Sequence, residues 1–431
     1  MTERLQKRRR RWAPFALAGI ALLAAGVVGC VNTLLPAVDM RYAGPPARPP
    51  VLAAFGDDGP VQTAQEWTTR RAPLIRAALE EHVYGRMPAP MAARVERRVP
   101  VVTRMIGPDA AAEQWTVRVT PRDVFNMVLV TPKGAGPHPV VVMQNFCGNR
   151  TAFSDRPTTV AMPLTSVMGA CHSRLAGPLI EAVFGRYTNG PPFAEIIARG
   201  YAVALFYAGD VVADVAADAP AGLAQFAGDA PVSQRPGAIA VWAWLYSRAT
   251  DVLAQDPRID PARIAIWGHS RNGKSALLAG AFDPRIAAVI AHQSGKGGAT
   301  LTRSYAGESV AQITEAYPHW FAPAYAGWAG REEEIPVDQH QLLALLAPRP
   351  VFLGAARRDR WSDPEGAFRA ARGADPVYEL FGVRGLDQAA MADRTLDAEL
   401  AFVLRGGRHG VTTADWRDFL TFLDAHLQDP P

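Results

Sequence analysis

Short apolar runs alternate with amphipathic stretches through the part of the chain that follows His138. Six of these runs have the length and the Val, Ile and Ala content of buried strands: PVVVMQNF, YAVALFYAGD, RIAIWGHS, IAAVIAHQS, PVFLGAARRD and ELAFVLRGG. The stretches with a helical period are AIAVWAWLYSRATDVLAQD, NGKSALLAGAF, DPEGAFRAARG and TADWRDFLTFLDAHL. This alternation predicts βα units around a mainly parallel central sheet flanked by helices, the α/β class.

The residues before His138 follow a different pattern. A helical segment, RAPLIRAALEEHVYG, precedes alternating polar and apolar residues in RVERRVPVVTRM and QWTVRVTP, which predict antiparallel strands. Three long polar segments rich in Pro and Gly, residues 151–192, 211–236 and 297–339, interrupt the later alternation. Because ligands bind at the carboxyl ends of the strands in such sheets, we expect these insertions to form the walls of a cleft.

The first thirty residues resemble an export signal. A basic run, RRRR, precedes an apolar stretch at residues 13–28, and small residues lead to Cys30. The tetrad VVGC resembles the lipobox of bacterial lipoproteins, in which the cysteine is lipidated and becomes the mature N-terminus. We therefore interpret residues 1–29 as a lipoprotein-type signal peptide, with an uncleaved membrane anchor as the alternative.

The distribution of charge excludes a nucleic-acid-binding protein, and the export signal predicts where the protein is located. The chain of 431 residues has a net charge of +4, but residues 1–29 alone carry six basic residues against Glu3, a charge of +5, which leaves −1 for the rest. The body therefore lacks the basic footprint of a nucleic-acid-binding protein. We expect a periplasmic or outer-membrane lipoprotein of a Gram-negative-type bacterium, in contact with a membrane only through its N-terminal segment.

Two further regions complete the predicted organisation. Residues 30–66 are rich in proline and weakly patterned, and we interpret them as a tether. Residues 67–431 are expected to form one large catalytic domain, because 49% hydrophobic and 20% charged residues are typical of a globular protein.

The stretch GHSRNGKS, residues 268–275, fits two motifs that cannot both operate. It satisfies the phosphate-binding pattern G-x-x-x-x-G-K-[ST] at every required position. It also fits the nucleophile elbow G-x-S-x-G of serine hydrolases except at the last position, where Asn272 stands and the glycine follows one residue later. A phosphate loop needs a second strand that ends in a metal-holding Asp, and here the candidate, Asp359, follows its strand only after two arginines.

The partners of a nucleophilic serine are present in the required order. In α/β-hydrolases the serine is followed by an acid and then by a histidine, and Ser270, Asp359 and His409 each follow a strand candidate in that order. The imidazole removes the hydroxyl proton, and the carboxylate orients the imidazole and stabilises its charge. We therefore predict an α/β-hydrolase with Ser270 as nucleophile, His409 as base and Asp359 as acid. Asp363 remains either an alternative acid or the cap of the following helix.

The other histidines are weaker candidates for the base, because none follows the last strand candidate. We expect His292 to be a core residue and His340 to lie at a helix end, and His319 is a further rival. The histidines lack the close ligand spacing of zinc sites, so no metal and no cofactor is predicted.

Several segments of the chain carry a family resemblance: GHSRNGK, HQSGKGGATLTR, GES, PHWF, DQHQLLALLAPRP, DRWSDPEGAF and GGRHG. Together they resemble the glucuronoyl esterases, the fifteenth family of carbohydrate esterases. The family elbow reads G-C-S-R-x-G followed by Lys, so the late glycine, Gly273, matches it. The fit to the phosphate pattern is then coincidental.

The resemblance implies hydrolysis of the ester that joins 4-O-methyl-glucuronic acid on xylan to an alcohol, a lignin alcohol in plant walls. It implies that Arg271 supplies an oxyanion donor, and that Lys274, Glu308 and Trp361 bind the sugar, while Trp320 is left as a core residue. A second oxyanion N–H is expected near Phe146 or Cys147. Another carbohydrate esterase, such as an acetylxylan esterase, is the alternative function, and a nucleotide-binding protein is a remote one.

Two departures from the family bear on the site. Fungal relatives place the catalytic acid in an E-S-G context where this chain has Gln293, which cannot carry a charge, so the acid must come from elsewhere. Bacterial members with an Asp after the next strand match Asp359. The second departure is His269, where many members have Cys. Cys147 and Cys171 then remain as one possible disulfide, with free thiols as the alternative.

Overall fold

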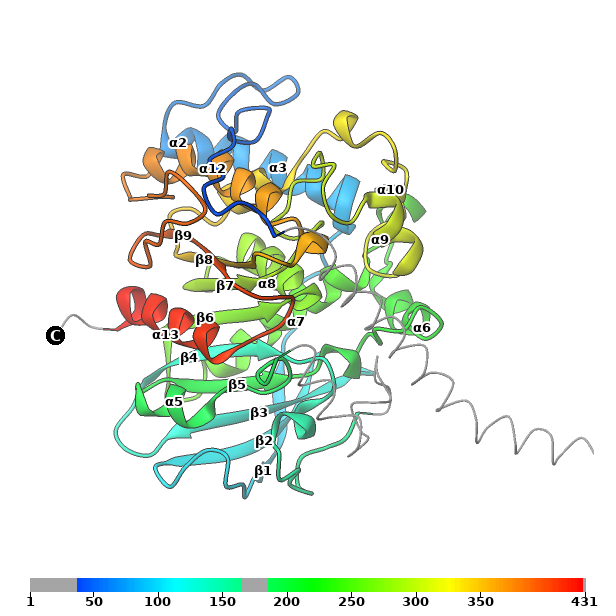
Figure 1. Ribbon diagram of the computed structural model, residues 1–431. Coiled ribbons are helices and arrows are strands. Elements are labelled where there is room, and N and C mark those ends of the chain that lie inside the picture. Colours follow the sequence, from blue (N-terminus) through cyan, green and yellow to red (C-terminus); the bar gives the residue numbers. More distant parts are fainter. Residues whose placement is uncertain (1–36, 164–184, 429–431) are drawn as a thin grey trace, which may run out of the picture.

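The computed structural model of the protein describes residues 37–163 and 185–428. Its centre is a nine-stranded sheet in the order β1-β2-β3-β5-β4-β6-β7-β8-β9 (Figure 1). The strands are β1 (Arg94–Pro100), β2 (Ala110–Arg118), β3 (Val124–Pro132), β4 (His138–Gln144), β5 (Ala202–Phe206), β6 (Ile259–His269), β7 (Ala288–His292), β8 (Val351–Ala356) and β9 (Leu400–Arg405).

The pairing of the strands confirms the predicted fold class. Strands β1, β2, β3 and β5 pair antiparallel, and every pair from β5 through β4, β6, β7 and β8 to β9 is parallel. All the strand candidates named above lie in strands of this sheet. Strand β3, VFNMVLVTP, was not predicted. It lies between β2 and β5 and so joins the N-terminal antiparallel strands to the parallel part of the sheet.

Helices cover both faces of the sheet, as predicted. Helices α7 and α8 pack in the core cluster of one face, and α5 and α13 in that of the other. In the part of the chain that the structure describes, the α-helices are α2 (Ala64–Glu66), α3 (Ala72–Leu79), α5 (Phe193–Ala198), α6 (Ala219–Leu223), α7 (Ala238–Leu253), α8 (Arg271–Phe282), α9 (Val310–Ala316), α10 (Pro323–Ala326), α11 (Gln339–Ala344), α12 (Pro364–Leu380) and α13 (Thr413–Leu427). Short 3-10 and π segments lie between them, among them η5 (Ala208–Asp210) and η9 (Arg360–Ser362).

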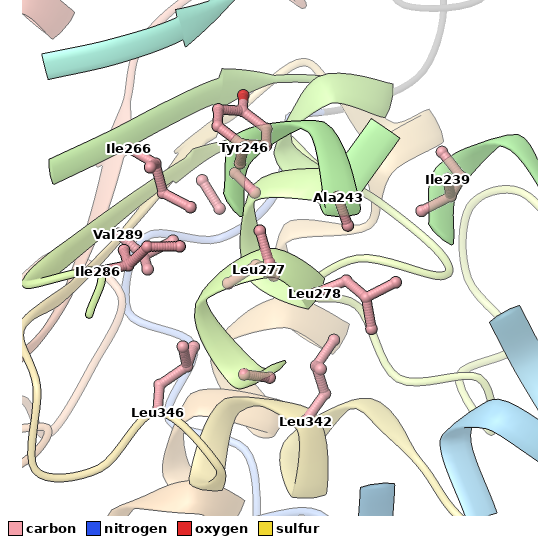
Figure 2. Packing of buried hydrophobic residues seen from close by; sticks show 14 of the residues in the cluster. Ile239, Ala243, Tyr246, Ile266, Leu277, Leu278, Ile286, Val289, Leu342 and Leu346 are labelled. Carbon is pink, nitrogen blue, oxygen red and sulfur yellow. The ribbon is translucent and has the colours of Figure 1, made fainter. Parts of the chain in front are cut away.

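The core consists of two apolar layers, one on each face of the sheet. Strand β4 shows why: Val140 and Val142 belong to the cluster that contains α7 and α8, whereas Val141 and Met143 belong to the cluster that contains α5 and α13. Successive side chains of a strand point to opposite faces, so an unbroken apolar run fills both layers. Figure 2 shows apolar side chains of α7, α8 and α11 gathered beside β6 and β7. Burying a Leu, Ile or Val side chain completely stabilises the folded state by about 1.5–3 kcal/mol relative to leaving it exposed.

The segment before α3 is not a tether where the structure describes it. Val38, Val51 and Val61 are buried in the first core cluster. The Val38 N–H donates to Arg357 O at 2.9 Å, which ties this segment to the end of β8. Arg71, fully buried, donates to the carbonyls of Val51, Ala53 and Gly59 and pairs with Asp58. The boundary predicted at Trp67 is therefore wrong for residues 37–66, because the apolar residues between the prolines pack against the body.

Two sequence-based interpretations lie outside the described residues. The signal peptide, residues 1–29, and the lipidation candidate Cys30 both precede residue 37. Within residues 37–163 and 185–428, none of the helices has the length and apolar character that crossing a membrane requires.

Candidate active site

Ser270 lies on a sharp turn between β6 and α8. Its backbone is strained, with φ 54° and ψ −125°, a conformation that non-glycine residues rarely adopt. A side chain at Gly268 would come within 2.0 Å of Asn272 O, and one at Gly273 within 3.0 Å of Gly268 O. The turn thus needs glycine two residues before and three after Ser270, which explains why the second glycine of the motif comes late.

The same geometry removes the phosphate-loop interpretation. Helix α8 begins at Arg271, directly after Ser270, so no loop remains to surround a phosphate. The Lys274 ammonium donates to Ser294 O at 2.6 Å and to Lys296 O at 2.5 Å. The Ser275 hydroxyl donates to the Gln144 side chain at 2.9 Å. The Lys and Ser of the phosphate pattern are therefore engaged within the protein.

His409 and Asp359 form a hydrogen-bonded pair beside this turn. His409 Nδ1 and Asp359 Oδ2 are 2.7 Å apart, and Asp359 is 1% exposed. Burial raises the pKa of Asp359, but the charge and the hydrogen bond of His409 together lower it by more. The pKa of Asp359 therefore lies below its usual value. The carboxylate is thus ionised where it can orient the imidazole.

Two contacts hold His409 next to the serine turn. The His409 ring lies 4.6 Å, centroid to centroid, from the ring of His269, the residue before Ser270. His292, at the end of β7, accepts the Ser270 N–H at its carbonyl at 2.8 Å, and its ring donates to Gly410 O at 3.1 Å. The end of β7 therefore connects the serine turn to the histidine loop. His292 is buried, as predicted for a core residue.

Arg271, the residue that follows Ser270, packs among aromatic rings. Its guanidinium carbon lies 4.6 Å from the ring centroid of Trp320 and 5.2 Å from that of Tyr317. Its Nη1 donates to Asp214, while its buried Nε has no hydrogen-bond partner among the described residues. Phe146, from the loop in which a second oxyanion donor is predicted, lies 5.9 Å away.

Lys274, Glu308 and Trp361 lie in neighbouring environments. Lys274 is 4% exposed and Glu308 is 6% exposed, and Trp361 contacts Glu308 through both backbone and side chain. Burial lowers the pKa of Lys274 to about 8, against the opposing effect of the Glu308 charge. Burial likewise raises the pKa of Glu308, and the Lys274 charge opposes it. Trp361 is 41% exposed and presents an apolar surface to solvent.

Comparisons with known proteins agree on one family. The family model for fungal glucuronyl esterases matches residues 190–382. A carbohydrate esterase from an unidentified prokaryote is 33% identical over 86% of this chain and 88% of its own. The solved glucuronoyl esterase of Solibacter usitatus is 32% identical, covers 89% of this chain and 100% of its own, and has a TM-score of 0.74. The chain belongs to the glucuronoyl esterases of carbohydrate esterase family 15 (CE15). A 4-O-methyl-glucuronoyl methylesterase of Phanerochaete carnosa is 27% identical over 86% of this chain and 82% of its own.

Gln293 has a structural task in this CE15 chain. Its Oε1 accepts the Gly410 N–H at 2.7 Å and its Nε2 donates to Arg408 O at 3.3 Å, so one amide binds both neighbours of His409. A carboxylate could accept the first hydrogen bond but could not donate the second. The glutamine that the family comparison marked as a lost acid therefore holds the histidine loop.

Asp363 caps a helix and does not contact His409. Its side chain accepts the Gly366 N–H at 3.0 Å at the start of α12 and also the hydroxyl of Ser304. Of the two acids that the sequence left open, the structure thus brings Asp359, and not Asp363, to the histidine.

The remaining candidates of the CE15 site are placed in part. Cys147 is buried and disulfide-bonded, whereas Cys171, its predicted partner, lies outside the described residues. His269 is buried and neutral, because burial, His409 and His292 hold its pKa well below the usual value. Within residues 37–163 and 185–428, His, Cys, Asp and Glu side chains form no group of three or more that could hold a metal ion.

The contacts of several residues around Arg271 and Lys274 could not be predicted from the sequence. Asp214 and His319 come from two different insertions and meet at 3.0 Å. Lys296 is buried, and its ammonium donates to three carbonyls of the following loop, at 2.7–3.2 Å. Trp320, predicted as core, is buried, but its ring also faces the Arg271 and Lys274 cations. The segment PHWF stood out in the sequence, but no local pattern predicts that its Trp320 contacts Arg271.

Proposed function

We propose that this CE15 chain is a serine esterase that hydrolyses esters of 4-O-methyl-glucuronic acid through Ser270, His409 and Asp359. The observation that carries the proposal is the 2.7 Å hydrogen bond between His409 and buried Asp359, beside the strained turn that presents Ser270. The methylesterase activity in the name of the Phanerochaete carnosa relative supports the substrate class.

The reaction proceeds in two halves. The Ser270 hydroxyl oxygen attacks the ester carbonyl carbon while His409 takes the hydroxyl proton, and the resulting tetrahedral intermediate collapses to a uronoyl-serine ester. His409 gives the proton to the leaving alcohol. Water then attacks the acyl group by the same route, releasing the uronic acid and restoring the serine. Asp359 keeps its charge throughout and stabilises the imidazolium.

Arg271 is the oxyanion donor in this proposal. Negative charge develops on the carbonyl oxygen in the tetrahedral state, and a fixed positive donor in a poorly solvated site stabilises that charge strongly. The backbone N–H of Arg271 follows the nucleophile directly, and its guanidinium is held among aromatic rings next to the turn.

Arg271→Ala should lower kcat on a benzyl ester of glucuronic acid by about 10²–10³-fold, the usual cost of one oxyanion donor. Steady-state kinetics on wild-type and variant chains, with thermal unfolding to check the fold, measures this. An unchanged kcat would remove the Arg271 guanidinium from the mechanism.

Lys274 should make substrate binding sensitive to pH. An ammonium has three N–H donors, and two of them are given to the Ser294 and Lys296 carbonyls, so one remains for a sugar hydroxyl. Because the pKa of Lys274 is about 8, the proton is lost above that pH, and the two N–H groups that remain are both used by the protein.

KM for the uronate ester is therefore expected to rise as pH increases through about 8, by roughly tenfold or more, the value of one charged hydrogen bond. Initial rates between pH 6 and 9.5, corrected for spontaneous hydrolysis, measure this. Lys274→Met should have a high KM at every pH; a rise above pH 8 that persists in this variant would contradict the assignment.

One assay separates this function from its rivals. The purified chain is tested on the benzyl ester of glucuronic acid, on acetylated xylan and for ATP binding. Hydrolysis of the first supports the proposal, hydrolysis of acetate esters alone would favour an acetylxylan esterase, and tight ATP binding would favour a nucleotide-binding protein.

We further propose export as a lipoprotein acylated at Cys30, which a globomycin-sensitive shift in mass on expression in bacteria would support.

A further inference from the structure

Asp214 connects three segments that lie far apart in the sequence. It follows η5, after the carboxyl end of β5, and its side chain is 8% exposed. Its Oδ1 accepts from Trp320 Nε1 at 2.7 Å and from His319 Nε2 at 3.0 Å, and its Oδ2 accepts from Arg271 Nη1. Three donors therefore converge on one carboxylate.

The charge on Asp214 matches that of Arg271. Burial raises the pKa of Asp214, but the charge of Arg271 and the hydrogen bonds of His319 and Trp320 together lower it by more. The carboxylate of Asp214 is therefore ionised. Among the described residues, Asp214 is the carboxylate that forms an ion pair with the Arg271 guanidinium. The aromatic rings around Arg271 favour a cation but exert little control over its rotation.

A guanidinium binds a carboxylate in a defined direction, and the carboxylate here is fixed by two further donors. Trp320 both donates to Asp214 and covers the face of the Arg271 guanidinium. The carboxylate thus sets where Nη1 lies, and through the planar guanidinium it sets where the remaining N–H groups point.

We propose that Asp214 is a positioning residue that aims the Arg271 guanidinium at the oxyanion of the tetrahedral intermediate. This inference rests on the proposed role of Arg271 in ester hydrolysis. Preorganisation is the physical basis: a donor already aimed at the developing charge needs no reorientation when the charge forms. A loosened arginine still neutralises charge but loses part of that advantage.

Asp214→Asn tests the inference. The amide oxygen can still accept from Trp320 or His319, while the negative charge that holds Arg271 is removed. Four full-length chains are compared on the benzyl ester of glucuronic acid: wild type, Asp214→Asn, Arg271→Ala and the double variant. We expect Asp214→Asn to lower kcat about tenfold or more with little change in KM, and to cost nothing further once Arg271 is alanine.

Two controls distinguish positioning from a general loss of structure. Asp210→Asn changes a carboxylate four residues earlier, which accepts from Asn126 N at 2.9 Å and from its side chain at 3.2 Å, and should leave kcat at the wild-type value. If Asp214→Asn does not fold, Trp320→Phe removes one donor to Asp214 and keeps an aromatic ring, and it should follow the same dependence on Arg271.

The outcomes separate the two hypotheses. An equal loss from Asp214→Asn with and without Arg271, or no loss when Arg271 is present, overturns the positioning role alone. An unchanged kcat in Arg271→Ala overturns the oxyanion role of Arg271, and the positioning role with it.

Discussion

Ser270→Ala is expected to lower kcat on the benzyl ester of glucuronic acid by about 10⁶-fold, to the level that binding and the oxyanion donors maintain without a nucleophile. The hydroxyl of Ser270 makes no capping hydrogen bond to α8, so its removal leaves the helix start intact. Alanine also has a Cβ, and the strain of φ 54° is therefore the same in both chains. The expected variant is folded, binds the ester and does not turn it over.

Ser275→Ala is the matched control. Ser275 lies in the same helix, is buried, and donates to Gln144 at 2.9 Å, so its loss affects packing and not the chemistry. Its kcat should stay within a few-fold of wild type while thermal unfolding shifts downward, since an unpaired buried acceptor costs about 1–3 kcal/mol. Substantial uronate esterase activity in Ser270→Ala would exclude this residue as the nucleophile.

Asp359→Asn is expected to lower kcat by about 10⁴-fold. The amide keeps the size of the carboxylate, but it presents an N–H or a neutral oxygen to His409 Nδ1 in place of a charge. Where the amide presents its N–H, the imidazole takes the tautomer with the proton on Nε2, which cannot accept the serine proton. In either orientation the imidazolium loses its counterion. Steady-state kinetics at pH 7, together with circular dichroism to confirm the fold, measures this.

Asp363→Asn provides the comparison that sequence analysis left open. Asn caps helices about as well as Asp, and Asp363 contacts Gly366 N and Ser304 and not the histidine. Both kcat and stability should therefore remain close to wild type. A large loss in Asp363→Asn with full activity in Asp359→Asn would reverse the assignment of the two acids.

The parts of the fold that a local pattern specifies could be predicted. Unbroken apolar runs such as Val140–Val142 occur where both faces of a strand are buried, and that is why the parallel strands were found. Strand β3, VFNMVLVTP, was missed although it contains a similar apolar run. The tether was extended too far because Pro-rich composition hid the buried Val38 and Val51.

The site divides in the same way. Ser270, Asp359 and His409 each follow a strand, so strand order alone brings them to one edge of the sheet. Asp214 and Gln293 could not be assigned, because each acts through a contact with a distant segment: Asp214 with Arg271, and Gln293 with the loop of His409. Neither residue lies in a repeating pattern from which such a contact follows.

A fluorophosphonate reacts with serine hydroxyls that a neighbouring base activates, so labelling with this reagent tests whether Ser270 is the nucleophile. The wild-type chain is labelled to completion, assayed on the benzyl ester of glucuronic acid, and digested for peptide mapping by mass spectrometry. We expect one adduct, on Ser270, complete loss of ester hydrolysis, and no labelling in His409→Ala. An adduct on a different residue, or full hydrolysis by a chain labelled at Ser270, would contradict this assignment.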